Sequence, residues 1–211
     1  MSQRENRRGP GRGSCLFRPP EYATGGLGMR IYPLNKGGAA EGIALAQGPV
    51  QLTDLTDAPR FGLKGRGSAD WVASQGRALP EVNRISDGLL RLGKEDLVVI
   101  GGADALRAVW HAASAPKGYN AWREETWAWL HLSGPRLEDL MAKICPVDLS
   151  TRAFGEGQIA QTRVGYVEAI LWRDTHGGQP GFSVFFDIAA TAFFANAITT
   201  AMTEFREAAL K

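Results

Sequence analysis

Three histidines and two cysteines are the side chains of this sequence that could transfer protons, bind a metal or attack a substrate near neutral pH. His111, His131 and His176 lie far apart, and none has a second His or Cys three or four positions away. Zinc sites are usually built from such closely spaced ligands, so we expect no metal site. Packing or surface roles are expected for His111, on a helix, and for His131, on a strand. His176 is expected in an exposed turn.

The two cysteines do not suggest a reactive site. Cys145 precedes Pro146 at the end of a short expected helix, among apolar residues that would bury the thiol and raise its pKa. Cys15 lies in the N-terminal segment and is expected to be a free thiol without function. So few cysteines, no secretory signal, and no apolar stretch of the roughly 20 residues that a membrane span needs together favour a cytoplasmic protein.

Two glycine-rich runs, at residues 25–28 and 62–67, resemble phosphate-binding loops only loosely. Neither has the Walker spacing, and the second lacks the G-x-G-x-x-G order, although it is expected to join a strand to a helix. A tight crossover that needs glycine explains the second run better than a nucleotide site does. We therefore expect no catalytic, cofactor-binding or metal-binding residue in this chain.

The charge of the 211 residues is unevenly distributed. Residues 1–20 hold five arginines and one acid, a local charge of +4, whereas the remaining residues sum to −2. A general nucleic-acid-binding surface is therefore poorly supported, and an RNA-associated module that uses the arginines ranks last among the functions considered. Glycine and proline interrupt this segment, so residues 1–22 are expected to form an extended or disordered arm, or to order against an acidic partner.

One pattern occurs twice, at an offset of 69 residues. Residues 61–65 end in Gly65 and are followed by Asp70, and residues 130–134 end in Gly134 and are followed by Asp139. Each copy reads as a strand, a glycine and a short helix, and the second helix has apolar residues at helical spacing.

A hairpin and a longer helix are expected after each short helix. In the first copy these are strands at 88–92 and 96–100 and a helix at 104–113; in the second, strands at 164–172 and 181–186 around a loop at 173–180, then a helix at 188–209. The fold class predicted is α+β, with two ferredoxin-like (split β-α-β) halves related by an internal repeat. The halves lie side by side or exchange elements.

Four segments are predicted along the chain. They are a basic arm at 1–22, an irregular Gly/Ala-rich segment at 23–49 with a short helical piece near 39–46, a first α+β half at 50–116 and a second at 117–211. Strands at 50–54 and 125–132 are expected to supply the remaining sheet edges, and residues 116–118 mark the joint between the halves.

Aromatic side chains gather at and after this joint. Trp127 and Trp129 share one strand face and are expected in the core, because side chains of a strand alternate between its two faces. For Trp122, with Tyr119 nearby, core packing and an aromatic contact with another subunit are equally supported.

A family resemblance rests on three stretches: residues 52–56, residues 60–71, and above all Cys145-Pro-Val-Asp-Leu-Ser-Thr-Arg-Ala-Phe followed by residues 160–167. From about residue 50 to the C-terminus the chain resembles the gamma subunit of heterotetrameric sarcosine oxidases and the small subunit of N-methylglutamate dehydrogenases. The strand-glycine-helix pattern is shared with the wider aminomethyltransferase and folate-binding-like superfamily.

The resemblance implies a non-catalytic gamma subunit of a complex that oxidatively demethylates a secondary N-methyl amine such as sarcosine. It implies alpha, beta and delta subunits as partners, with FAD, FMN, NAD and zinc held by those subunits and tetrahydrofolate accepting the one-carbon unit. No nucleic acid and no membrane is implied as a partner.

The alternative is a stand-alone folate-dependent one-carbon transferase or folate-binding protein. Such an enzyme needs an acidic group for the pterin, and Asp187 and Glu168 are the only acids near suitable strand ends. Each is equally well explained, as a helix N-cap or as a residue of a solvated sheet edge.

The Cys145–Phe154 stretch also has a local physical explanation. Pro146 ends the helix, and Asp148 is expected to bond its downstream amides in an Asx turn and to pair with Arg152. Gln161 and Thr162 lie on an expected strand, as polar core residues or as interface residues.

Overall fold

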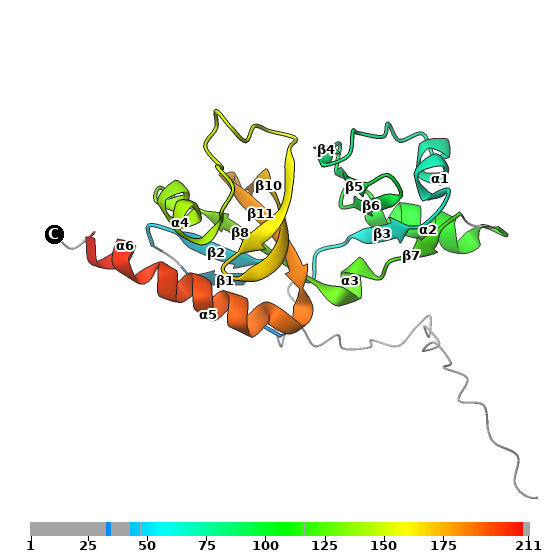
Figure 1. The fold of residues 1–211 in the computed structure, drawn as a ribbon. Helices are drawn as coiled ribbons and strands as arrows, with labels where there is room; N and C mark the ends of the chain where they lie inside the picture. The colour runs from blue at the N-terminus through cyan, green and yellow to red at the C-terminus, as the bar shows by residue number, and fades with distance from the viewer. Residues whose placement is uncertain (1–32, 35–42, 47, 116, 209–211) are drawn as a thin grey trace, which may run out of the picture.

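The computed structural model describes residues 33–34, 43–46, 48–115 and 117–208. Two antiparallel β-sheets pack against each other, and each carries helices on its outer face (Figure 1). The layers therefore run helices, sheet, sheet, helices, with an apolar core in each of the three spaces between them. The fold class is α+β, as the sequence predicts.

The smaller sheet has five strands in the order β4-β5-β6-β3-β7. These strands are β3 (Phe61–Lys64), β4 (Arg84–Ser86), β5 (Leu89–Gly93), β6 (Asp96–Val99) and β7 (Tyr119–Asn120). Helices α1 (Ser68–Ser74) and α2 (Ala103–Ala112) cover its outer face, where Val72 of α1 and Leu106 of α2 are buried against the sheet.

The larger sheet has six strands in the order β1-β2-β8-β11-β10-β9. They are β1 (Ile43–Ala46), β2 (Gln51–Asp54), β8 (Trp127–Ser133), β9 (Ile159–Val164), β10 (Val167–His176) and β11 (Gln179–Asp187). Its outer face carries α4 (Leu137–Ile144) and α5 (Thr191–Ala201), which bury Leu140 and Phe194. The remaining helices are α3 (Arg123–Thr126), the 3-10 turn η1 (Ile188–Ala190) and α6 (Thr203–Ala208).

The central strands of the larger sheet are apolar on both faces because both faces are covered. In β11, Phe182, Val184 and Phe186 contribute to the core under the helices, whereas Phe185 contributes to the core between the sheets. Trp129 and Trp172 lie in the same inter-sheet core, and Leu90 and Val98 of the smaller sheet complete it from the other side.

The first strand of each half pairs with the other half. β2 precedes β3 in the chain but pairs with β8, and β7 precedes β8 but pairs with β3. The segments 55–60 and 121–126 therefore connect the two sheets. On a different side, Ile85 N donates to Gly157 O and Ile159 N donates to Asn83 O, so that β4 and the start of β9 meet across the sheets.

Several predicted boundaries are wrong. The expected loop at 173–180 is mostly strand, because β10 and β11 continue to a two-residue turn at Gly177 and Gly178, whose φ angles of 56° and 76° suit a tight hairpin. Residues 43–46, expected in a helical piece, form β1; residues 39–42 lie outside the described residues. Residues 125 and 126, expected in a strand, end α3.

Two further differences concern the repeat and the last helix. Each sheet has a strand that the repeat did not include, β4 or β9, and the internal ferredoxin-like repeat is not confirmed. The helix expected at 188–209 is divided into η1, α5 and α6. Of the described helices, none has the length and apolar character to cross a membrane.

Candidate functional site

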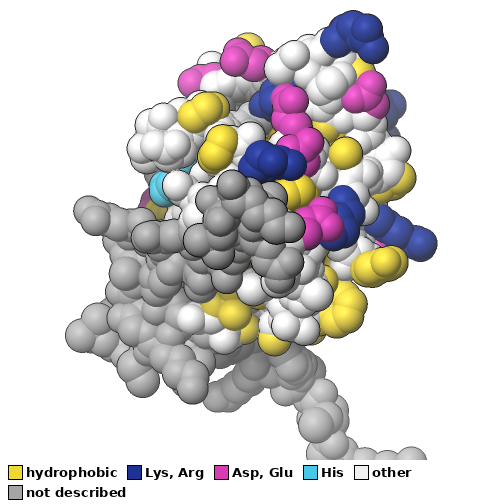
Figure 2. All heavy atoms as spheres, turned by 90° about the vertical axis from the view of Figure 1, so that its left-hand side faces the viewer, with side chains coloured by type: hydrophobic (Ala, Val, Ile, Leu, Met, Phe, Trp, Pro, Cys, Tyr) yellow, Lys and Arg dark blue, Asp and Glu magenta, His cyan; other side chains and the backbone are white. Residues whose placement is uncertain are grey.

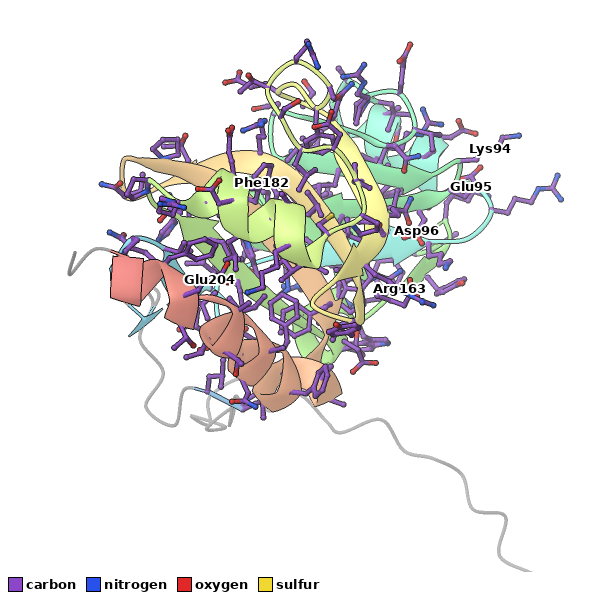
Figure 3. The ribbon with its side chains drawn as sticks, turned by 60° about the vertical axis from the view of Figure 1, so that its left-hand side comes forward. Lys94, Glu95, Asp96, Arg163, Phe182 and Glu204 are labelled. Carbon is purple, nitrogen blue, oxygen red and sulfur yellow. The ribbon has the colours of Figure 1, made fainter. Side chains whose placement is uncertain are left out.

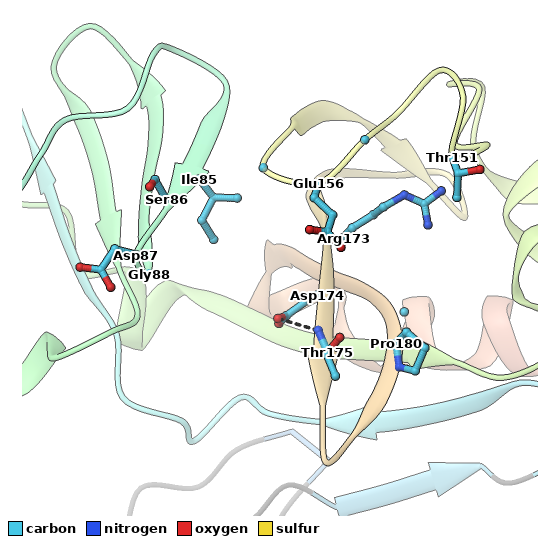
Figure 4. Close-up of a pocket in the computed structure, with 13 residues that line it drawn as sticks. Ile85, Ser86, Asp87, Gly88, Thr151, Glu156, Arg173, Asp174, Thr175 and Pro180 are labelled. Carbon is cyan, nitrogen blue, oxygen red and sulfur yellow. Dashed lines mark hydrogen bonds between the residues drawn. The ribbon is translucent and has the colours of Figure 1, made fainter.

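A cleft of about 700 Å³ opens between the two sheets near the β4–β9 junction (Figure 4). One wall is the β4–β5 turn, with Ile85, Ser86 and Asp87, and the other wall comes from the loop before β9 and from β10 and β11. Its lining residues are Ile85, Ser86, Asp87, Gly88, Thr151, Gly155, Glu156, Gly157, Arg173, Asp174, Thr175, Pro180 and Gly181. A concave space between two halves of a fold is where a ligand site is first sought.

The charged groups of the cleft do not match an anionic ligand. Asp87, Glu156 and Asp174 contribute carboxylates, and Arg173 is the only cation among the lining residues. Arg173 is committed elsewhere: its Nε donates to Phe154 O at 2.7 Å, its Nη2 donates to Leu149 O, and its guanidinium lies over the Phe182 ring. The cleft therefore offers no uncommitted cation to a carboxylate or phosphate.

Asp174 connects the cleft to a buried polar network. Ser183 Oγ donates to Asp174 Oδ2 at 2.8 Å and accepts from Trp129 Nε1 at 3.0 Å. His131 Nδ1 lies 3.5 Å from the same Oγ, and His131 Nε2 lies 3.3 Å from Gln179 O. Serine, histidine and aspartate are thus brought together from β8, β10 and β11.

This network does not have the geometry of a nucleophilic triad. In a triad the carboxylate orients the imidazole, which accepts the serine proton, whereas here the carboxylate accepts from the serine directly. Ser183 is fully buried and His131 is 1% exposed, so a substrate would not reach the hydroxyl. Burial lowers the pKa of His131, with Asp174 and the Gln179 carbonyl acting in the opposite direction. The arrangement fits a neutral, structural imidazole.

The other two histidines take packing or surface positions. His176 is partly exposed at the end of β10, with its ring 5.8 Å from that of His131, and exposed His111 packs edge-on against Trp110. Among the residues that the structure describes, no group of three His, Cys, Asp or Glu side chains could hold a metal ion.

The glycine-rich loop at 62–67 leads into α1, whose first amides are already occupied. Glu95, in the β5–β6 turn, accepts from Ala69 N at 3.0 Å and from Ser68 Oγ at 3.2 Å (Figure 3). The bond from Ala69 N is the main cause that lowers the pKa of Glu95. The chain's own carboxylate thus takes the position of a phosphate, and the crossover interpretation is the better one. Residues 25–28 and Cys15 lie outside the described residues.

The Cys145–Phe154 stretch forms a folded loop anchored in the core. Cys145 is 6% exposed and burial raises its pKa, as expected. Asp148 Oδ1 accepts from Ser150 N at 3.0 Å, which forms the predicted Asx turn and lowers the pKa of Asp148. Arg152 contributes to this lowering as a nearby charge. No hydrogen bond or close ion pair joins these two described side chains, so the predicted pairing is wrong in its direct form.

Gln161 proves to be an interface residue between the two sheets. Its Nε2 donates to Leu92 O and to Asn83 Oδ1, both at 2.7 Å. The two acids considered for a transferase have structural contacts. Asp187 Oδ1 caps η1 by accepting from Ala189 N at 2.8 Å, and Glu168 accepts from Arg163 Nε at 2.6 Å on the surface.

The tryptophans divide as their strand positions predict. Trp129 lies in the inter-sheet core and Trp127 packs against it. Trp122 is 40% exposed and has a φ of 50°, so it is not a core residue.

The residue most important to this junction was not found from the sequence. Arg60 is fully buried, and its guanidinium donates to the carbonyl oxygens of Thr56, Ala58, Arg123, Glu124 and Trp127. A lone arginine before a strand gives no pattern that separates it from a surface arginine. Ser183 and Glu95 were missed for the same reason, since their partners lie 9 or more positions away.

Comparison with known proteins gives relatives of one kind. The chain is 28% identical over 178 residues to sarcosine oxidase subunit gamma of Arthrobacter sp, covering 77% of this chain and 86% of that protein. It is 29% identical over 146 residues to sarcosine oxidase subunit gamma of Corynebacterium sp. (strain P-1), covering 62% of this chain and 72% of that one. No family model matches the chain.

Solved structures give the same fold. A chain of the heterotetrameric sarcosine oxidase from Corynebacterium sp. U-96 superposes with a TM-score of 0.62 at 23% identity, over 77% of this chain and 89% of that chain. Glycine cleavage system aminomethyltransferase T from Bartonella henselae superposes with a TM-score of 0.50 at 15% identity. That match covers 74% of this chain but only 46% of the aminomethyltransferase, so the fold is aminomethyltransferase-like without the full length of such an enzyme.

Proposed function

We propose that this chain, a homologue of the gamma subunits of sarcosine oxidases, is the gamma subunit of a heterotetrameric flavoenzyme. That enzyme oxidatively demethylates a secondary N-methyl amine such as sarcosine and passes the one-carbon unit to tetrahydrofolate. The observation that carries this proposal is the sequence similarity to two gamma subunits, which extends over 86% and 72% of their lengths.

Within the complex the chain has a structural rather than a catalytic role. The cleft between the sheets is the obvious place for a ligand, and its polar groups are used internally. Arg173 holds two backbone carbonyls, and Ser183 and Asp174 bond each other. A side chain already fixed by internal bonds supports the fold rather than a reacting substrate.

The alternative, a stand-alone folate-dependent transferase, is not favoured. Folate carries carboxylates on its glutamate tail, and the cleft presents Asp87, Glu156 and Asp174 without an uncommitted cation. Like charges in a partly desolvated site oppose binding. Asp187 and Glu168, the two candidate acids, serve as a helix cap and as a surface ion-pair partner.

The finer features follow from the same proposal. FAD, FMN, NAD, zinc and tetrahydrofolate are held by the alpha, beta and delta subunits, and the complex is cytoplasmic. Within this chain a basic arm at 1–22 and a Gly/Ala-rich segment at 23–49 precede two halves at 50–116 and 117–211. These halves derive from an internal repeat, and the pairing of β2 with β8 and of β7 with β3 supports an exchange of their first strands.

Co-expression with the larger subunits tests the proposal. An affinity tag on this chain should recover the flavin-bearing chains in equimolar amount, and the recovered complex should oxidise sarcosine or a related N-methyl amine. The chain expressed alone should show no flavin absorbance and no heat of binding with tetrahydrofolate. Micromolar binding of tetrahydrofolate by the lone chain would instead favour the transferase.

A further inference from the structure

A second concave surface lies on the outer side of the larger sheet, away from the cleft. It is a groove of about 740 Å³ between the C-terminal end of α4, the β9–β10 turn and one side of α5. We call it the α4–α5 groove; its lining residues are Ala142, Lys143, Ile144, Cys145, Pro146, Arg163, Gly165, Tyr166, Phe193, Asn196, Ala197, Thr200 and Ala201. Figure 2 looks at this side of the molecule and shows hydrophobic side chains interspersed with charged ones.

Two exposed aromatic rings border this groove. Tyr166 is 90% exposed and Phe193 is 57% exposed, and both are among the large hydrophobic side chains that the described surface leaves open. Exposed aromatic rings beside a concavity are typical of protein interfaces, where tyrosine in particular anchors binding. An aromatic pair of this kind lowers the solubility of a free chain, so its presence favours a covered surface.

The backbone under Tyr166 gives a second, independent reason. Gly165 and Tyr166 form the two-residue turn between β9 and β10 with φ angles of 54° and 71°. This turn favours Asn or Gly at both positions, and a bulky residue there is strained. Backbone strain of this kind is concentrated at functional sites. The turn therefore holds a tyrosine ring in solvent at the expense of the stability of the free chain.

The charges of the groove determine what can cover it. Its lining includes the cations Lys143 and Arg163 and no carboxylate. Lys143 pairs with Glu204 at 3.0 Å and Arg163 with Glu168 at 2.6 Å, through side chains that are 45–76% exposed, and such exposed pairs are weak. In Figure 3 Glu204 lies at one end of the α4–α5 pair and Arg163 toward the other. Arg163 uses only Nε among the described residues, so its remaining donors can receive a carboxylate.

Two occupants from this chain itself are disfavoured by charge. A symmetric dimer through the groove would place Lys143 and Arg163 of one copy against the same cations of the other, because an isologous interface pairs a patch with itself. Residues 1–20 have a charge of +4 and are likewise mismatched with a groove lined by cations. An occupant with apolar side chains flanked by carboxylates satisfies both the rings and the cations.

Building on the proposed function, we propose that the α4–α5 groove is the docking surface for a larger subunit of the complex. That subunit inserts an apolar side chain between Tyr166 and Phe193 and directs carboxylates at Lys143 and Arg163. The contact uses the outer face of this chain and leaves the cleft between the sheets uninvolved.

The test exploits the strained turn. Tyr166→Asn removes the ring and places at that position a residue that the turn favours, so the free chain should keep or raise its melting temperature. In the full complex with co-expressed larger subunits, we expect the dissociation constant of this chain to rise at least tenfold. Phe193→Asn should act in the same direction, and Lys143→Glu with Arg163→Glu should weaken binding further. Val109→Asn, which removes a 48%-exposed hydrophobic side chain on α2, serves as the matched control and should bind as the wild type does.

Each outcome decides one of the two proposals. A wild-type dissociation constant for Tyr166→Asn and for the charge-reversed variant, with the complex still forming, overturns the docking surface and leaves the proposed function intact. A wild-type dimer in sedimentation that is lost in Tyr166→Asn assigns the groove to a second copy and also overturns the proposal. If the wild-type chain captures no larger subunit, the proposed function fails.

Discussion

The Nε of Arg60 donates to the backbone carbonyl of Arg123 at 3.2 Å, although 63 positions separate the two residues. The same guanidinium also bonds Thr56 O at 2.8 Å and the carbonyl of Trp127. Arg60 thus holds together the two segments through which the halves exchange their first strands. A fully buried cation is retained here because it satisfies carbonyl oxygens that no other described side chain reaches in these bonds.

Replacement of this arginine should strongly destabilise the chain. Arg60→Met keeps a long side chain but leaves several buried carbonyls without donors, and we expect a loss of about 3 kcal/mol in the free energy of unfolding. Urea unfolding followed by tryptophan fluorescence measures it. Arg152→Met, at an exposed position, is the control and should change the free energy by no more than about 0.5 kcal/mol. Equal effects of the two substitutions would show that Arg60 does not hold the junction.

Glu95 should stabilise α1 from the neighbouring turn. Glu95→Ala removes the acceptor for Ala69 N and Ser68 Oγ, and we expect a loss of about 1 kcal/mol at neutral pH, typical of a lost helix cap. Glu81→Ala, at an exposed position, should have a much smaller effect.

The effect of Glu95 should also depend on pH. Its pKa is lowered in the folded chain, so its contribution is fully present above the ordinary glutamate value of about 4.3 and is lost as the pH falls through the lowered folded value. The stability difference between the wild type and Glu95→Ala should therefore shrink in acid. A difference that stayed constant down to the lowest pH at which the chain folds would argue against the carboxylate cap.

His131 should give the chain a second pH dependence, at a higher pH. Burial lowers its pKa, so the unfolded chain binds a proton at His131 before the folded chain does. Stability should be complete above the ordinary histidine value of about 6.5 and should fall progressively below it. His131→Gln should flatten the plot of unfolding free energy against pH between about 5 and 7, whereas His111→Gln should leave it unchanged. An unaltered slope in His131→Gln would assign the effect to other groups.

The fold was predictable where the residues responsible are close in sequence. The helices at 137–144 and 191–201 follow from apolar residues at helical spacing, and the Asx turn at Asp148 follows from one dipeptide. The β10–β11 hairpin was cut short because Arg173 and Asp174 read as loop residues. Their side chains are accommodated within a strand by bonds to Leu149, Phe154 and Ser183, which come from other parts of the chain.

The candidate site shows the same limit. The sequence placed Cys145, Trp129 and the three histidines in plausible environments, but not the bonds that connect Ser183 with Asp174 or Gln161 with Leu92. These bonds join residues that become neighbours only when the sheets form. The exposed Tyr166 is similarly invisible in the sequence, since its importance comes from a positive φ in a two-residue turn.

Flavin content and amine oxidation by the chain purified alone, compared with the same chain purified with its larger subunits, test the account most directly. We predict a colourless, inactive polypeptide by itself, and full flavin absorbance and turnover of an N-methyl amine only in the assembled complex. Bound flavin or amine turnover by the lone polypeptide would contradict the structural role assigned to it.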